Sequence, residues 1–167
     1  MGDLAKRLVD IAQGEVGVRE EGPNTGSRVI IYQMSTSLSP GPWPWCAAFV
    51  SWCVREWVMR MTDAERTRIG ALDGPIGWRC NSANVYDWEK WAVNRRLKLF
   101  EEDQPMQPGD IVTFDFGHIG IVKEDHGPQF VSIEGNTNDQ GSREGDGVYV
   151  RRRARSLIRK IIRITDL

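Results

Sequence analysis

The sequence predicts an α+β domain in which helices come first and antiparallel strands follow. Apolar residues recur at intervals of three and four up to about residue 91, which is the spacing of helices. From about residue 110 they alternate with polar residues, which is the spacing of strands. Helices and strands in separate parts of a chain favour an α+β fold over a doubly wound one. A length of 167 residues suits one domain, and we expect residues 1–167 to form it.

Three helices are expected in the first part, over about residues 3–13, 45–61 and 82–91. Asp3 can cap the first helix, because its carboxylate can accept hydrogen bonds from the first turn. The segment 29–34 is short and apolar and fits either a helix or a strand. Residues 35–45 hold Ser, Gly and Pro and should be irregular, and residues 62–80 are mixed in pattern.

The second part predicts five strands, over residues 110–114, 118–123, 129–134, 147–151 and 157–164. The turn EDHGP separates the second strand from the third. With this turn centred near His126, Val122 would pair with Phe130. The same register places His118 opposite Glu134, whereas a slip of one residue would turn Glu134 to the other face.

The charge pattern makes some partners improbable. The formal net charge is −1, so the whole chain offers no electrostatic basis for binding nucleic acid. Residues 151–163, in contrast, hold seven Arg or Lys. We expect a solvated face there, and an anionic partner such as a wall polymer or membrane surface is the alternative. No stretch approaches the roughly 20 apolar residues of a membrane span, so stable membrane insertion is not expected.

The cysteines do not form a familiar framework. Cys46, Cys53 and Cys80 are odd in number, and no two have the Cys-x-x-Cys spacing of a zinc ribbon or redox site. The segment REEGPNTG also lacks the alternating Asp/Asn ladder of a calcium loop. We therefore expect no disulfide framework, no metal and no other cofactor. The N-terminus lacks the apolar core of a signal peptide, which predicts synthesis in the cytoplasm.

The stretch PWPWCAAFV places Cys46 in the first turn of the expected second helix. The N–H groups and partial positive charge of a helix N-terminus stabilise a thiolate, and the fixed φ of Pro42 and Pro44 stiffens the approach. Cys46 therefore has the setting of a nucleophile. Free cysteines are also common as buried packing residues, a role that stays open for Cys46 and is expected for Cys53 and Cys80.

The chain has two histidines that could activate such a thiol. His126 falls in a turn and is expected to be solvated. His118 opens the strand HIGIV, where Glu134 would orient its ring and Asn136 would lie one step diagonal to it. Gly120 would leave open space for a substrate or a thiol. Each residue also fits an ordinary structural role, but with the cysteine they supply the nucleophile, base and orienting group of a cysteine hydrolase.

The motifs PWCAAFVSWC, PGDIVTFDFGHIGIV and IEGNTN together resemble the CHAP family of peptidoglycan hydrolases, within the NlpC/P60-like group of papain-like cysteine peptidases and amidases. The resemblance extends from about residue 4 to residue 165. It implies a papain-like α+β core with the cysteine helix packed on an antiparallel sheet. It also implies a nucleophile at Cys46, a base at His118, a third polar residue at Glu134 and a fourth at Asn136.

The same resemblance implies cleavage of an amide bond in bacterial peptidoglycan, by an N-acetylmuramoyl-L-alanine amidase or an endopeptidase. Trp43 and Trp45 could bind substrate by stacking at the cleft rim, or could pack as a lid over the helix start. A small wall hydrolase without a signal peptide is similar to a phage endolysin released by a holin, or to an antibacterial effector delivered by a secretion system. We expect a monomer.

Two rival hypotheses stay open. The first is a catalytically silent cell-wall-binding protein on the same fold, in which Cys46 would react like an ordinary thiol. The second is a structural zinc protein, whose spacing of ligands would match no common zinc pattern. Its four ligands would be Cys46, Cys53, Cys80 and His118.

Overall fold

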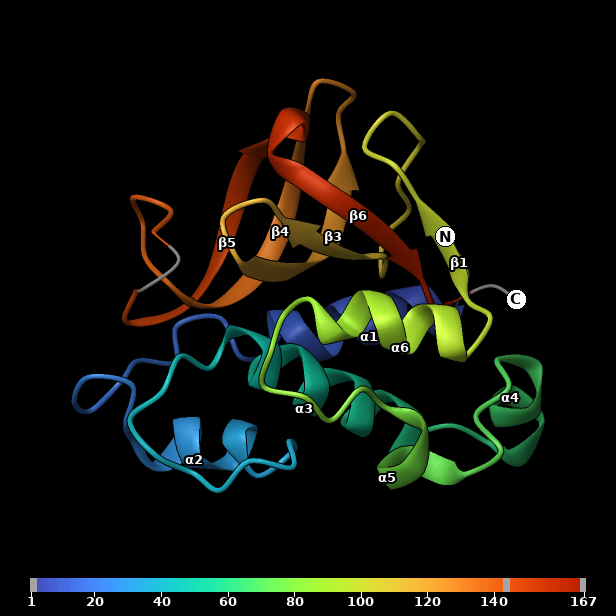
Figure 1. Cartoon of the computed structure of the whole chain (residues 1–167), viewed down its shortest axis with the longest axis horizontal. Helices are drawn as coiled ribbons and strands as arrows, with labels where there is room; N and C mark the ends of the chain where they lie inside the picture. Colours follow the sequence, from blue (N-terminus) through green and yellow to red (C-terminus); the bar gives the residue numbers. More distant parts are fainter. Residues whose placement is uncertain (1–2, 143–144, 166–167) are drawn as a thin grey trace.

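The computed structural model describes residues 3–142 and 145–165, which form a helical layer and a curled sheet (Figure 1). The helices are α1 (Asp3–Gln13), α2 (Ser27–Gln33), α3 (Cys46–Met59), α4 (Asp63–Arg68), α5 (Gly74–Trp78) and α6 (Asp87–Asn94). The strands are β1 (Lys98–Phe100), β2 (Ile111–Phe114), β3 (His118–Asp125), β4 (Gln129–Thr137), β5 (Gly147–Ala154) and β6 (Ile158–Arg163). They form a six-stranded sheet in the order β1-β6-β2-β3-β4-β5, and neighbouring strands are antiparallel.

The α+β prediction is confirmed, and the differences from it are local. The ambiguous segment 29–34 belongs to the helix α2, and α6 begins at Asp87 rather than near residue 82. The helices α4 and α5 and the strand β1 were not expected. A signal for α4 was present, because Thr62 and Glu65 form a capping box in which each side chain bonds the other's backbone N–H.

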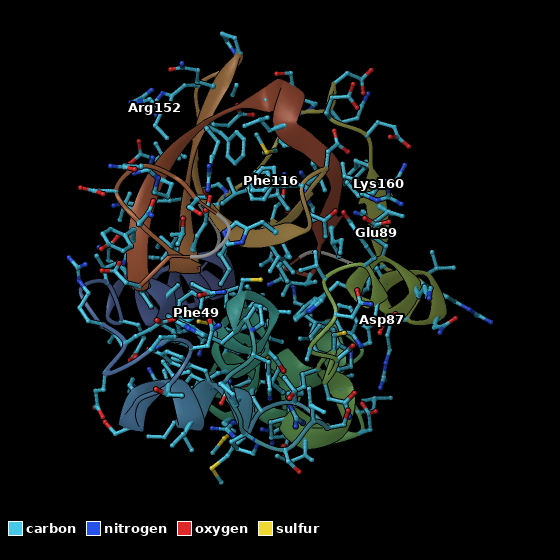
Figure 2. The ribbon with its side chains drawn as sticks, turned by 60° about the vertical axis from the view of Figure 1, so that its left-hand side comes forward. Phe49, Asp87, Glu89, Phe116, Arg152 and Lys160 are labelled. Carbon is cyan, nitrogen blue, oxygen red and sulfur yellow. The ribbon has the colours of Figure 1, made fainter. Side chains whose placement is uncertain are left out.

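The helix α3 is the centre of the fold, and almost its whole length is buried. Its N-terminal half packs on β3 and β4, where Gly135 permits a close approach. A Cβ atom on Gly135 would lie 2.7 Å from Cβ of Phe49. Figure 2 labels Phe49 at this junction between the helices and the sheet. The N-terminus of α3 is thereby held against the end of β4.

The sheet curls over a second, smaller apolar core on its other face. This core contains the residues Met106, Val112, Phe114, Val122, Phe130, Ile158 and Ile161. A sheet with both faces packed holds its strands in one register, so polar groups inside it have fixed positions.

Most basic side chains of the run 151–163 bind acceptors within the protein. Arg153 is buried against Glu134, Arg163 pairs with Asp110, and Arg155 pairs with Asp125. Arg151, Arg159 and Lys160 also contact acceptors in the protein. Arg152 is exposed, and Figure 2 shows it at the outer edge of the sheet. The run therefore stabilises the sheet and its loops, which leaves little of it for an anionic partner.

Within the described residues, none of the helices combines the length and the apolar character needed to cross a lipid bilayer. All three cysteines are free thiols and all three are buried. The candidate site must therefore be sought at buried groups that also reach a cleft.

Candidate active site

Cys46 is the first residue of α3, as the sequence predicts, and its side chain meets a cleft. The residue is 5% exposed. The cleft that it lines has a volume of about 810 Å³ and separates the helical layer from the loop between β2 and β3. Other lining residues are Leu38, Trp43, Pro44, Val85, Tyr86 and Phe116. The thiol is thus shielded from bulk water but accessible to a molecule that enters the cleft.

His118 is the first residue of β3 and is fully buried. Its Nε2 lies 2.9 Å from Oε2 of Glu134. Its Nδ1 is buried and makes no hydrogen bond among the described residues. Burial favours the neutral ring, but the interactions with Cys46 and Glu134 outweigh it and raise the pKa of His118 to about 9. Nε2 is held by the carboxylate, so Nδ1 is the ring nitrogen that remains for a second partner.

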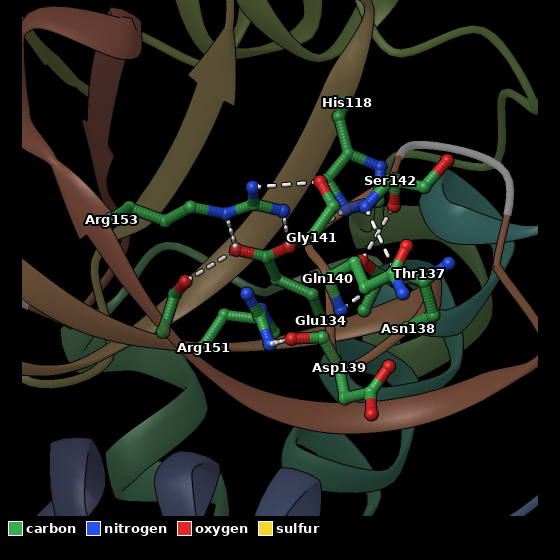
Figure 3. A network of polar contacts seen from close by, with 11 residues as sticks. His118, Glu134, Thr137, Asn138, Asp139, Gln140, Gly141, Ser142, Arg151 and Arg153 are labelled. Atoms are coloured by element: carbon green, nitrogen blue, oxygen red, sulfur yellow. Dashed lines mark hydrogen bonds and ion pairs between the residues drawn. The ribbon is translucent and has the colours of Figure 1, made fainter.

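Glu134 is fully buried, and both of its carboxylate oxygens accept hydrogen bonds. It accepts hydrogen bonds from Ser132 Oγ at 2.6 Å and from Arg153 Nε at 2.9 Å and Nη2 at 2.5 Å, besides its contact with His118 (Figure 3). Burial alone would raise the pKa of Glu134. The hydrogen bonds from Arg153 and His118 reverse this and lower it to about 2. Glu134 is therefore an anion between two cationic partners.

The pairing of β3 with β4 corrects the expected register. Val122 pairs with Ser132 and not with Phe130. Asp125 pairs with Phe130, so the turn is centred between Gly127 and Pro128 and not near His126, and the bulge after Val122 then changes the register by one residue. The shift from the expected pairing is even, so Glu134 keeps the face of His118 but moves toward Gly120. The space above Gly120 is not open to substrate as expected. A Cβ atom there would lie 2.8 Å from Cγ of Glu134, so the carboxylate side chain itself fills this space.

Asn136 is buried at the end of β4, in the irregular stretch between Glu134 and Thr137. Its φ is 54°, a left-handed conformation that Asn adopts more readily than most residues. Its carbonyl accepts a hydrogen bond from Gly145 at 3.1 Å. Asn136 thus lies where the pairing of β4 with β5 shifts register between Glu134 and Thr137.

The two tryptophans before Cys46 have different positions. Trp43 lines the cleft and donates from Nε1 to the Ser39 carbonyl at 2.9 Å. Trp45 is fully buried, stacks on Tyr32 and donates to Glu20 at 2.7 Å. The stacking surface expected from Trp45 is therefore absent from the cleft, because the residue that precedes the helix points into the core.

Sequence reasoning missed three residues around His118. Phe114 and Phe116 stack on its ring, each with centroids 5.8 Å from it. The alternation in FDFGH was the available signal, since alternate residues share a face. Arg153 was hidden in the run RRR and lay beyond the expected end of its strand.

The remaining titratable candidates do not join the site. His126 is exposed and lies 2.9 Å from Glu124. Burial raises the pKa of Cys53 well above its usual value, and that of Cys80 to about 11, so both thiols stay protonated. Among the described residues, no three of His, Cys, Asp and Glu are grouped as a metal ion requires, so the four zinc ligands considered above do not come together.

A second hollow, of about 870 Å³, lies between residues 19–24 and the connection from β4 to β5. Glu20, Glu21 and Asn24 line it. Cys46 and His118 are not among its described lining residues. Its size alone does not connect it to the chemistry of the thiol.

The chain is similar to known proteins in its motifs and fold. The CHAP domain profile matches residues 38–136, a range that includes Cys46, His118, Glu134 and Asn136. The crystal structure of Ly7917 has 16% sequence identity and a TM-score of 0.50, with 96% of this chain and 62% of that chain covered. The crystal structure of Ly7917 with the hydrolyzing product of MDP has 15% sequence identity and a TM-score of 0.48. The match covers 96% of this chain and 63% of that chain. This chain thus spans less than two thirds of Ly7917. No curated protein matches the sequence.

Proposed function

The chain belongs to the CHAP domain family, and from this premise we propose that it is a cysteine hydrolase of bacterial peptidoglycan. The proposed reaction is hydrolysis of an amide bond in the wall peptides, as an N-acetylmuramoyl-L-alanine amidase or as an endopeptidase. Support for a wall substrate comes from Ly7917, whose crystal structure was also solved with the hydrolyzing product of MDP.

One observation carries the proposal. Cys46 opens a helix and lines a cleft, and it interacts with a buried imidazole whose Nε2 is held by an ionised carboxylate. A thiol, a base and an orienting anion in this order are the components of a cysteine hydrolase. A protein that only binds the wall would not need an imidazole with a pKa of about 9 beside a thiol.

The proposed mechanism has two stages. In the first, the Cys46 thiolate attacks the amide carbonyl, and backbone N–H groups at the start of α3 stabilise the oxyanion. His118 gives its proton to the leaving amine as the carbon–nitrogen bond breaks, which leaves a thioester. In the second stage, neutral His118 takes a proton from water. The hydroxide formed attacks the thioester carbonyl, the carbon–sulfur bond breaks, and the carboxylic acid is released. This restores the Cys46 thiolate and the protonated His118.

Each polar partner has a separate role in this scheme. Glu134 acts through His118, because it holds Nε2 and leaves Nδ1 facing the reaction. Asn136 lies at the register shift of β4 that follows Glu134, and we propose that it supports the orientation of the ring. Trp43, Tyr86 and Phe116 give the cleft planar apolar walls on which a peptide or sugar ring can pack.

The first test is digestion of purified peptidoglycan, with the released fragments identified by mass spectrometry. Native protein should release fragments, Cys46→Ala none, and His118→Gln at least about 100-fold fewer per unit time. His126→Gln is the matched control, since it removes the exposed histidine and should digest normally. New L-alanine N-termini would identify an amidase, and shortened stem peptides an endopeptidase.

The outcome that contradicts catalysis is equally specific. If native protein and Cys46→Ala sediment with wall fragments alike and neither releases soluble products from several wall types, the protein is a wall-binding member of the family. Folded Cys46→Ala, verified by its thermal unfolding, is required for either conclusion.

We also propose that the protein reaches the wall from the cytoplasm through a holin or a secretion system. Bacteria that express it in the cytoplasm alone should grow normally, and co-expression of a holin should cause lysis. Lysis with native protein but not with Cys46→Ala would support this route, whereas intact cells in both cases would count against it.

A further inference from the structure

Arg153 is the second cationic partner of Glu134, besides His118. It comes from β5, and only 8% of the residue is exposed. Its Nε and Nη2 donate to the two different carboxylate oxygens of Glu134, at 2.9 Å and 2.5 Å. This two-point contact fixes both the position and the rotation of the carboxylate, because a guanidinium and a carboxylate are matched planar groups.

The same guanidinium is itself fixed from two further sides. Its Cζ lies 5.4 Å from the ring centroids of Phe114 and Phe116, the two rings that also stack on His118. Its Nη1 donates to the Gly141 carbonyl at 2.9 Å, as Figure 3 shows. Arg153 and His118 therefore share one carboxylate and one aromatic pair, which leaves Glu134 little freedom to turn.

We propose that Arg153 is a positioning residue of this site, which fixes the Glu134 carboxylate and keeps it aimed at His118, so that the ring is held in place to serve Cys46. This inference rests on the proposed function, because it assigns the role of one more side chain in the same cysteine site. The family resemblance assigns no role to Arg153.

The charges around Glu134 determine the direction of the effect. The groups that face it are His118 from β3, Arg153 from β5 and the Ser132 hydroxyl from its own strand; Cys46 from α3 faces His118. Burial opposes the charge of Glu134, so loss of Arg153 raises the pKa of the carboxyl. Once Glu134 takes a proton, the His118 ring loses the anionic partner that holds it. The thiol should then lose reactivity at a higher pH than in the native protein.

The test is the rate of Cys46 alkylation by iodoacetamide between pH 3 and pH 9, followed by mass spectrometry of the peptide. In Arg153→Met the acid midpoint of the rate should rise by roughly one to three pH units. Arg153→Lys retains the charge without the two-point contact and should shift less. This readout needs no wall substrate, so it can succeed or fail independently of peptidoglycan digestion.

The strand β5 supplies two matched controls. Arg152→Met removes an exposed charge from the neighbouring position. Arg151→Met removes a contact with the Asp139 carbonyl, and so loosens the same loop without touching Glu134. Both should keep the native midpoint. If Arg151→Met shifts it as far as Arg153→Met does, the loop rather than the carboxylate controls the thiol, and the proposal is wrong.

A second pair of variants covers the case in which Arg153→Met unfolds because it leaves a buried anion. Glu134→Gln and the double variant Glu134→Gln/Arg153→Met remove that anion. If Arg153 acts through Glu134, the two should have the same acid midpoint within about 0.3 pH units. A further shift in the double variant would show that Arg153 acts on the thiol by a route other than Glu134. An unshifted midpoint in folded Arg153→Met would reduce Arg153 to a structural ion pair, and either outcome overturns the proposal.

Discussion

Glu134 is the buried anion of the candidate site, and side chains from the neighbouring strands β3 and β5 balance its charge. Its carboxylate contacts His118, Arg153 and Ser132 and is fully buried, so it has no alternative partner in water. A buried anion of this kind is tolerated only while its hydrogen bonds are intact. Small geometric changes near it should therefore affect chemistry more than they affect the fold.

Gly120→Ala tests this sensitivity of the chemistry, because it adds a single carbon atom next to Glu134. The new Cβ would lie 2.8 Å from Cγ of Glu134, and the carboxylate is anchored at its far end and has no room to retreat. We expect the His118 contact to lengthen and peptidoglycan hydrolysis to fall by about 100-fold, the cost of roughly 1 Å of misplacement. The rate of wall solubilisation and the urea midpoint of unfolding measure the two effects separately.

The companion variant is Glu134→Ala/Gly120→Ala, in which the clashing Cγ is gone. Adding Gly120→Ala to Glu134→Ala should leave stability nearly unchanged. A large extra loss of stability in the double variant would mean that Gly120 serves the strand itself and not the carboxylate.

At the scale of elements, the sequence predicts the positions of the strands well, but it does not predict the register in which β3 and β4 pair. Alternating patterns gave the starts of β3, β4 and β5 within a residue, because burial on one face enforces a period of two. The alternation marks neither the centre of the turn, which lies beyond His126, nor the bulge after Val122, so the observed register differs from the predicted one by two residues. The predicted end of the β5 strand at residue 151 excluded Arg153, which lies two residues further on the same face as Arg151.

The residues of the site also divide into those that a local pattern predicts and those that depend on distant contacts. Cys46, His118 and Glu134 each stand in a local pattern, a helix start or a strand face, that the sequence displays. Trp45 has the same kind of setting as Trp43, but the direction of its side chain depends on contacts with Tyr32 and Glu20, which are distant in the chain. Long-range contacts of this type are not encoded in local periodicity.

The close packing of α3 on β4 gives a prediction about these two elements. Gly135→Ala places a Cβ 2.7 Å from Cβ of Phe49 and 2.9 Å from Cζ3 of Trp45. The helix must then shift or the strand must bend, which should lower the free energy of unfolding by about 1–3 kcal/mol. Gly14→Ala is the control, since its Cβ would meet backbone oxygens only at 3.4 Å and 3.5 Å. Urea denaturation of both variants decides whether the contact limits the approach; equal midpoints would show that it does not.

At the scale of the whole molecule, the site lies where two layers meet, and each layer supplies part of it. Cys46 comes from the central helix, whereas His118, Glu134 and Arg153 come from three neighbouring strands. Docking of the helix on the sheet therefore assembles the site, and the energies of its buried charges become part of the stability of the fold.

The pH dependence of unfolding should show this coupling. The pKa of His118 is about 9 in the fold against an ordinary 6.5, so its contribution to stability is complete below pH 6.5 and is lost as the pH rises toward 9. The pKa of Glu134 is about 2 against an ordinary 4.5, so its contribution is complete above pH 4.5 and is lost as the pH falls toward 2. The pair should stabilise the protein most between pH 4.5 and pH 6.5.

Urea unfolding at a series of pH values measures this dependence, and two variants isolate its source. Glu134→Gln removes one titrating group and the anion that supports the other, so the loss of stability above pH 6.5 should become shallower. His126→Gln removes an exposed histidine and should leave the native profile intact. If Glu134→Gln keeps the full alkaline slope, the raised pKa of His118 depends on Cys46 rather than on the carboxylate, and Cys46→Ala should then flatten it instead.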